Sequence, residues 1–154
     1  MAGDSTDAAS AAAASGLHRP EMSAPEIAAK IAARRELFSR RVDAWLASDL
    51  DTYLDCWADD MVIEMPTGRV AGKDRYRKVV KAGFAWAEPV AFDVHHLAFE
   101  ESGDVALADW TIRARRRDDR VVIGWRGLSV CSFHADKITW WREHHLAPPG
   151  PLDD

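Results

Sequence analysis

The sequence contains little of what metal, redox or membrane chemistry requires. Its 154 residues include only two cysteines, Cys56 and Cys131, which lie far apart and outside any CxxC pattern. That spacing forms neither a redox pair nor a cysteine-histidine metal site, so we expect reduced core thiols, a cytoplasmic protein and no bound metal. No apolar run approaches the roughly 18 residues that can span a bilayer. We therefore expect no membrane partner.

The charge and glycine patterns argue against nucleic-acid-binding proteins and against enzymes that use a nucleotide cofactor or a covalent intermediate. The formal net charge is −5, and the one basic run, at residues 113–117, is followed directly by Asp118 and Asp119. Because nucleic-acid binding needs a basic surface, we expect no nucleic-acid partner. The chain also lacks a glycine-rich phosphate loop, a nucleophile elbow and a Ser-His-Asp order. We therefore expect no cofactor and no covalent catalysis.

Tryptophan, by contrast, is abundant, with seven residues in this short chain. Its large apolar area and single N–H favour cores, pockets and interfaces. Five of the seven fall in segments that we expect to face the interior, namely Trp45, Trp57, Trp110, Trp125 and Trp141. Taken one by one these are typical core residues. Together they also indicate an aromatic cavity for a flat, apolar ligand, and both interpretations remain open at this stage.

The chain divides into a tail, one domain and a second short tail. Residues 1–22 are rich in Ala, Ser and Asp and have almost no large apolar groups, so we expect a disordered tail. Ser23 and Glu26, with Pro25 between them, form the signature of a capping box that begins a helix. We expect the domain to cover residues 23–147 and a C-terminal tail to cover residues 148–154.

Helices dominate the first half of the domain. An apolar stripe predicts a helix to about residue 47, and it consists of Ile27, Ile31, Phe38, Val42 and Trp45. Acidic residues at 49–51 begin a second, shorter helix that should end at 59–60 and turn Tyr53 and Trp57 inward. A short strand over 61–65 follows, and a third helix begins at 72–74.

The second half reads as a sheet. Four alternating runs, at 90–100, 104–116, 120–133 and 136–146, are separated by breaks short enough for hairpins. Helices followed by an antiparallel meander predict an α+β fold. A strongly twisted sheet would curl around the helices and enclose a cone-shaped cavity between them. The expected architecture is a cone with three N-terminal helices packed on a strongly curved, mostly antiparallel sheet.

The last strand carries the best catalytic candidate. Strict alternation would place Thr139, Trp141, Glu143 and His145 on one face, and Ile138, Trp140, Arg142 and His144 on the other. A carboxylate beside tryptophan and histidine on a buried face must be paired or functional, because burial without a partner is costly. We interpret Glu143 as a general acid/base assisted by His145. The alternative is an ion pair with a strand arginine such as Arg126 or Arg113.

Glu64 is a second candidate, because it interrupts the apolar strand at 61–65. If it entered the same cavity as Glu143, the two carboxylates could divide the acid and base roles. Otherwise it is a solvated residue of an edge strand. His95 and His96 are adjacent on a strand, so alternation sends them to opposite faces, and we place His96 in the pocket. Asp109 falls on the polar face of its strand, which suits solvent or a dimer interface.

The order of these elements, with Met65-Pro66 after the short strand, Gly72-Lys73-Asp74 opening the third helix and residues 137–143 near the end, resembles the NTF2-like superfamily. The resemblance covers roughly residues 25–147. Within the superfamily it is strongest to the SnoaL-like polyketide cyclase group and the limonene epoxide hydrolase group. It implies the cone fold, but these families carry out several different reactions.

Carried over by position, the resemblance supports Glu143 and leaves other machinery unmatched. A Trp-Arg-Asp segment of the epoxide hydrolases corresponds to Trp141, Arg142 and Glu143, and SnoaL-like cyclases also have an acid/base carboxylate in this strand. The hydrolases' water-holding asparagine falls on Glu64, and their Arg-x-Asp pair falls on Trp110 and Ile112. The base of ketosteroid isomerases falls on Met65. Epoxide hydrolysis and ketosteroid isomerisation by those particular residues are therefore not expected.

The sequence thus predicts a cofactor-independent acid/base enzyme that acts on a small apolar or polyketide-like molecule by cyclisation, isomerisation, dehydration or epoxide opening. The expected catalytic residues are Glu143 and Glu64. The expected pocket residues are Trp45, Tyr53, Trp57, Met65, His96, Trp110, Ile112, Trp125, Trp141 and His145. We expect a homodimer formed through the outer sheet face. The alternative is a non-catalytic binding or assembly module of the same fold.

Overall fold

A computed structural model describes residues 22–146 together with Gly150 and Pro151. The tail expected at residues 1–22 lies outside the described residues except for Met22. Of the C-terminal tail expected at 148–154, only Gly150 and Pro151 are described, and they form the short strand β7 (Gly150–Pro151), which pairs with β5.

Helix α1 (Ala24–Leu46) begins as expected. The Ser23 hydroxyl accepts a hydrogen bond from the Glu26 backbone N–H, and the Glu26 carboxylate accepts one from the Ser23 N–H at 2.7 Å. These reciprocal bonds satisfy donors that the first turn otherwise leaves free. Phe38 and Val42 are buried on the inner side of the helix, as the apolar stripe predicts.

Helix α2 (Leu50–Asp55) is shorter than expected, because its chain turns into β1 (Trp57–Met65) well before residue 59. Trp57 therefore belongs to a strand rather than a helix, although it is still fully buried. A tight turn with Gly68 at a positive φ of 143° then leads into β2 (Gly68–Ala71), a strand that the sequence pattern did not indicate. Helix α3 (Lys73–Trp86) follows β2, so only two of the three helices precede the first strand.

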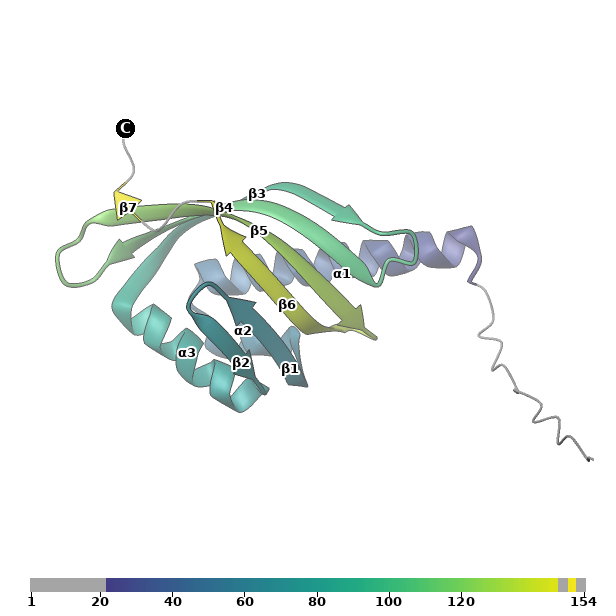
Figure 1. Ribbon diagram of the computed structural model, residues 1–154, viewed down its shortest axis with the longest axis horizontal. Helices are drawn as coiled ribbons and strands as arrows, with labels where there is room; N and C mark the ends of the chain where they lie inside the picture. The colour runs from purple at the N-terminus through teal and green to yellow at the C-terminus, as the bar shows by residue number, and fades with distance from the viewer. Residues whose placement is uncertain (1–21, 147–149, 152–154) are drawn as a thin grey trace, which may run out of the picture.

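The remaining strands are β3 (Ala87–Phe99), β4 (Val105–Arg116), β5 (Val122–His134) and β6 (Lys137–His145). Together with β1 and β2 they form one sheet in the order β2-β1-β6-β5-β4-β3 (Figure 1), and among the described strands only the β1–β6 pair is parallel. The predicted α+β class is therefore confirmed. Because the first and last long strands are neighbours, residues near positions 64 and 143 come to the same end of the sheet.

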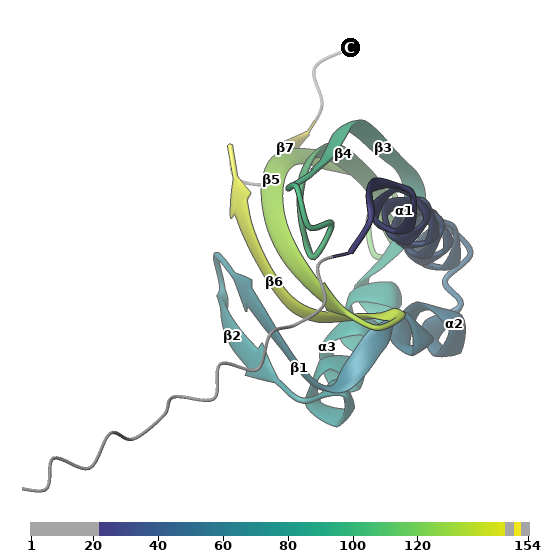
Figure 2. The same cartoon turned by 90° about the vertical axis from the view of Figure 1, so that its right-hand side faces the viewer.

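The sheet curves around α1, and α3 packs on β1 and β3 (Figure 2). The concave face holds the core. Its largest fully buried side chains are Trp57, Trp110, Trp141, Phe38, Leu54 and Met61. On β4 the predicted alternation is confirmed, since Ala106, Ala108 and Trp110 are buried while Leu107 lies exposed on the outer face.

Several register shifts break the alternation elsewhere, and two of them, one in β6 and one in β3, affect predicted site residues. In β6, Ser132 of β5 pairs with Trp140 and Phe133 pairs with Ile138, so Thr139 is an extra residue. Because a bulge shifts the side-chain alternation by one, Ile138 lies inside together with Trp141, and the expected assignment of these two residues to opposite faces is wrong.

A second bulge lies in β3. Val94 pairs with Trp110 and His96 pairs with Asp109, which leaves His95 as the extra residue. Both histidines consequently lie on the outer face, where His95 bonds Thr111 at 2.8 Å and His96 contacts Asp109 at 3.3 Å. The expectation that they point to opposite faces, with His96 in the pocket, is therefore wrong.

Candidate functional site

Glu143 projects from the concave side of β6 and is only 15% exposed. Its Oε2 accepts a hydrogen bond from the Trp141 indole N–H at 3.0 Å, and its Oε1 lies 3.2 Å from His145 Nε2. Among the described residues no arginine or lysine forms an ion pair with it, so the alternative pairing with Arg126 or Arg113 is not found. The carboxylate is held by an indole and an imidazole, inside the cone.

His145 is itself enclosed by aromatic rings. The Trp110 ring meets it edge-on with centroids 5.9 Å apart, and the Trp125 ring lies at 6.4 Å. The position of Trp110 depends on Gly127, since a Cβ at that residue would lie 2.5 Å from the indole. A side chain at position 127 would therefore displace the tryptophan.

An aromatic cleft of about 200 Å³ opens between α3, the C-terminal end of α1 and the sheet. Four of the predicted pocket residues line it, namely Trp45, Tyr53, Met65 and Trp125. The apolar face of α3 supplies much of the rest, through Tyr76, Val79, Val80, Gly83, Phe84 and Trp86. This contribution was missed as a pocket wall, although the inward periodicity of the helix was visible in the sequence.

A second, shallower groove of about 470 Å³ adjoins the turn between β1 and β2. Glu143 and His145 border it, as do Glu64 and Arg142. Met65 lines both this groove and the aromatic cleft, so both hollows contact this side chain.

Glu64 borders the groove but does not face Glu143. It pairs in register with Arg142 on the outer side of the sheet and accepts a hydrogen bond from the Arg142 guanidinium at 2.5 Å. That hydrogen bond holds the pKa of Glu64 below its usual value. The expectation of two carboxylates turned toward one cavity is therefore not met, because neighbouring residues on β6 alternate between the two faces.

The remaining predicted pocket residues lie elsewhere. Trp57, Trp110, Ile112 and Trp141 are buried in the core and do not line the cleft. The side chain of His96 is 81% exposed on the outer face. Its partner Asp109 is also bound by Arg126 at 2.7 Å, and that hydrogen bond lowers the pKa of Asp109 to about 2. Asp109 is thus part of a surface ion-pair cluster, as its place on the polar face suggests.

Arg41 is a charged residue that pattern analysis missed. It is only 5% exposed, and its guanidinium lies 4.2 Å from the Trp141 ring centroid. It follows Phe38 by three positions and precedes Trp45 by four, which places it on the apolar stripe of α1. Its place on this stripe is the feature of the sequence that could have identified Arg41 as an inward-facing residue. Burial disfavours its charge, but Tyr53, Tyr76 and Glu143 nearby more than compensate and raise the pKa of Arg41.

The floor of the cleft carries a pair of phenols. The hydroxyl oxygens of Tyr53 and Tyr76 are 2.9 Å apart and both side chains are buried. Burial, reinforced by the neighbouring Tyr53, raises the pKa of Tyr76 well above its usual range. Tyr76 therefore stays protonated at neutral pH and can donate a hydrogen bond.

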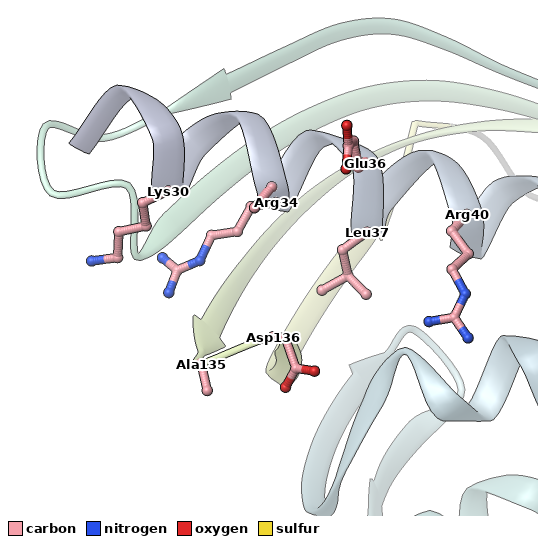
Figure 3. Close-up of a pocket in the computed structure, with 8 residues that line it drawn as sticks. Lys30, Arg34, Glu36, Leu37, Arg40, Ala135 and Asp136 are labelled. Carbon is pink, nitrogen blue, oxygen red and sulfur yellow. The ribbon is translucent and has the colours of Figure 1, made fainter. Parts of the chain in front are cut away.

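Another hollow, of about 420 Å³, lies between α1 and the β5–β6 turn at the opposite end of the cone (Figure 3). Its cationic residues are already paired. Arg34 and Lys30 bind Asp104, and Arg40 binds Asp55. Because those charges are neutralised and Glu143 is remote, this hollow is not the candidate site.

The described residues contain no group of three His, Cys, Asp or Glu side chains arranged to hold a metal ion. None of the helices within residues 22–146 has the length and apolarity needed to cross a membrane.

The curved sheet and the helix that it encloses define an NTF2-like fold. A family model described as a SnoaL-like domain matches residues 38–141, and the chain belongs to that family. The resemblance inferred from the motifs is thus confirmed. No curated protein matches the sequence.

Solved structures of the same fold are similar over most of their length. An LEH-like epoxide hydrolase from M. tuberculosis is 20% identical, with 79% of this chain and 85% of that chain covered and a TM-score of 0.64. A ketosteroid isomerase-like protein from Erwinia carotovora atroseptica is 16% identical, covering 77% and 98% with a TM-score of 0.63. An NTF-2 like protein from Burkholderia xenovorans LB400 is 19% identical, covering 79% and 87% with a TM-score of 0.62. At these identities the similarity establishes the fold alone.

Proposed function

We propose that the protein is a cofactor-independent acid/base enzyme that acts on a small apolar or polyketide-like molecule. The observation that carries this proposal is Glu143, a carboxylate inside the cone whose bonds are to Trp141 and His145 rather than to a cation. A carboxylate in such surroundings can accept or donate a proton without first breaking a salt bridge. Its two oxygens are also fixed in direction, which favours one geometry of transfer.

The two adjoining hollows suggest how a substrate would be held. Its apolar body would pack in the aromatic cleft against Trp45 and Trp125, and its reacting atom would extend past Met65 toward Glu143. Proton transfer requires an approach of about 2.6–3.2 Å between heavy atoms, so the substrate must enter the groove. His145 would orient the carboxylate and exchange its proton with solvent, since it borders the same groove.

The proposed chemistry is a cyclisation, isomerisation, dehydration or epoxide opening, each of which needs a proton to be moved beside an apolar body. The proposed enzyme would not use the catalytic residues that the resemblance to the epoxide hydrolases implies. At the corresponding positions Glu64 is bound to Arg142, while Trp110 and Ile112 are buried in the core.

A second function, a non-catalytic small-molecule-binding module, is favoured by one observation. Trp110 and Trp141 fill the centre of the cone, and Glu143 borders the groove without lining the larger apolar surface of the cleft. Ligand binding without turnover would be the expected behaviour of such a module.

The test is a thermal-shift screen with polycyclic ketones and epoxides, followed by product analysis for each compound that binds. A ligand present at 100 times its Kd should stabilise the fold by about 2.7 kcal/mol. Conversion of a stabilising compound at a rate above that of buffer supports the enzyme. Stabilisation without any product would contradict the enzyme and support the binding module.

We also propose that the protein forms a homodimer through the outer sheet face. Leu107 and Leu128 are 53% and 39% exposed there, on neighbouring strands β4 and β5. Asp109 is directly opposite Leu128 and binds Arg126, so this ion pair borders the two leucines and offers complementary charges to a second copy. An exposed apolar patch rimmed by charge is typical of a protein interface.

Leu107→Glu is accordingly expected to convert the dimer to a monomer, because it buries a charge in the interface. Analytical ultracentrifugation would measure the mass. Val121→Glu is the matched control, since Val121 is 37% exposed but lies in the β4–β5 loop. A wild-type protein that sediments as a monomer at micromolar concentration would refute the proposal.

A further inference from the structure

Arg41 is a buried cation that the proposed proton transfer does not use. Its Nε and Nη1 atoms have no hydrogen-bond partner among the described residues, and neither does the nearby Trp57 Nε1. An arginine this deeply buried normally donates to a carboxylate or to several carbonyl groups, because buried N–H donors left without hydrogen-bond partners cost free energy even where neighbouring groups favour the charge. The three unpartnered donors therefore indicate a group that the protein itself does not supply.

The surroundings of Arg41 are aromatic on several sides. Its guanidinium carbon lies 5.4–5.6 Å from the ring centroids of Phe38, Tyr53, Trp57 and Phe92 and 4.2 Å from that of Trp141. Cation–π contacts offset part of the desolvation of the charge, but they use the faces of the guanidinium and leave its N–H edge free.

Arg34 shows how the same helix holds an arginine for a structural purpose. It lies seven residues earlier on the same face of α1 and is equally buried. Its guanidinium donates to the carbonyl oxygen of Gly103 and to the Asp104 carboxylate at 2.6 Å, and stacks on Phe133. Arg34 thus ties α1 to the β3–β4 hairpin, whereas Arg41 has no comparable anchor.

The aromatic cleft leads toward Arg41. Tyr53 both lines the cleft and lies against the guanidinium, and its hydroxyl contacts that of Tyr76 on the cleft floor. The rest of the lining is almost wholly aromatic and aliphatic. A ligand at this part of the cleft would therefore find the one hydroxyl proton that the Tyr53–Tyr76 hydrogen bond leaves free, with the Arg41 guanidinium 5.4 Å from the Tyr53 ring centroid.

We propose that the cleft floor is an anion-binding subsite, in which the Tyr53 and Tyr76 hydroxyls and the Arg41 guanidinium hold a planar, negatively charged oxygen group of an otherwise apolar ligand. Trp57 Nε1 is a further donor to the same group. The inference rests on the proposed role of the cleft in ligand binding. It names the substrate class as a flat apolar molecule with a carboxylate, or with a carbonyl or phenol that becomes anionic at the site.

The test is calorimetric titration of the full chain with 2-naphthoate and with its neutral counterpart 2-acetylnaphthalene. Naphthoate should bind at least about tenfold more tightly, as charge-assisted hydrogen bonds to a buried anion require. Arg41→Met should remove this preference while leaving the melting temperature of the free protein unchanged or raised, because methionine packs well against rings and carries no charge.

Arg34→Met is the matched control. It removes a buried arginine of the same helix about 10 Å away, so it should lower the melting temperature and keep the preference for naphthoate within about twofold. Tyr76→Phe provides an independent variant, which should reduce the preference even if Arg41→Met does not fold. Equal affinities in the wild-type protein, or a preference that survives in Arg41→Met, would overturn the subsite and leave Arg41 solvated by ordered water only.

A third ligand distinguishes the two sources of negative charge. If 2-naphthol binds at neutral pH with the absorption spectrum of its anion, the subsite stabilises charge that develops on the ligand. If it binds only as the neutral phenol, the subsite selects preformed carboxylates. Because all these measurements concern binding, failure of the subsite is separable from failure of the enzyme proposal, which is decided by product formation.

Discussion

Replacing Glu143 by glutamine is expected to lower turnover of the substrate at least about 100-fold, which is typical for loss of a general acid or base. The substitution keeps the shape of the side chain and an oxygen that can accept from the Trp141 indole, as Oε2 does at 3.0 Å. The melting temperature and the ligand Kd should therefore change little. The effect should fall on kcat, measured with the compound identified by the thermal-shift screen.

Glu64→Gln is the matched control for this experiment. Glu64 borders the same groove, but its carboxylate is on the outer side of the sheet and is held by Arg142. It should retain turnover within about twofold, since surface ion pairs contribute little and the reacting atom is on the other face. Unchanged turnover in Glu143→Gln would remove Glu143 from the mechanism. An equal loss in both variants would instead indicate a shared structural effect.

The fold could be predicted from the sequence because its cues were local. The capping box at Ser23 and the alternation of β4 each depend on residues within a few positions of one another, and both are confirmed. The predicted end of α2, at residues 59–60, was wrong for a non-local reason. Trp57 pairs with Ile138 of β6, and this long-range strand pairing begins β1 while the local pattern is still helical.

The site was less predictable, because two bulges changed which side chains face inward. Thr139 and His95 are extra residues in their strands, and each is explained only by the register with the neighbouring strand. Glu143 was placed correctly because it lies after the bulge on the same face as Trp141. His96 was assigned to the wrong face, because the extra residue His95 shifts the alternation and turns His96 outward.

Arg41 illustrates a different limit. Position on a helical stripe identifies an inward side chain, but an arginine there is usually assumed to reach solvent with its charged end. Whether it does so depends on how closely Tyr53, Trp57 and Trp141 enclose it, and two of these come from strands on the opposite side of the core. Tertiary packing alone therefore distinguishes a buried charge from a surface one.

Trp110 fills the part of the cone next to His145, and its removal should have the largest effect on stability. Its ring packs against Phe92 with centroids 6.0 Å apart, and its N–H donates to the Ser129 hydroxyl at 2.7 Å. Trp110→Ala is expected to lower the free energy of unfolding by about 3–5 kcal/mol, as for other large core aromatics. Urea denaturation followed by circular dichroism would measure the loss.

The contact with Gly127 makes this prediction specific. In the wild-type background Gly127→Ala should cost about 1–3 kcal/mol, because its Cβ would lie 2.5 Å from an indole held in place by Ser129. In the Trp110→Ala background the same change should cost almost nothing, or stabilise, since the added methyl group enters the space left by the ring. Additive effects of the two substitutions would contradict the packing of Trp110 on Gly127, and with it the view that this tryptophan is held against His145 beside the catalytic carboxylate.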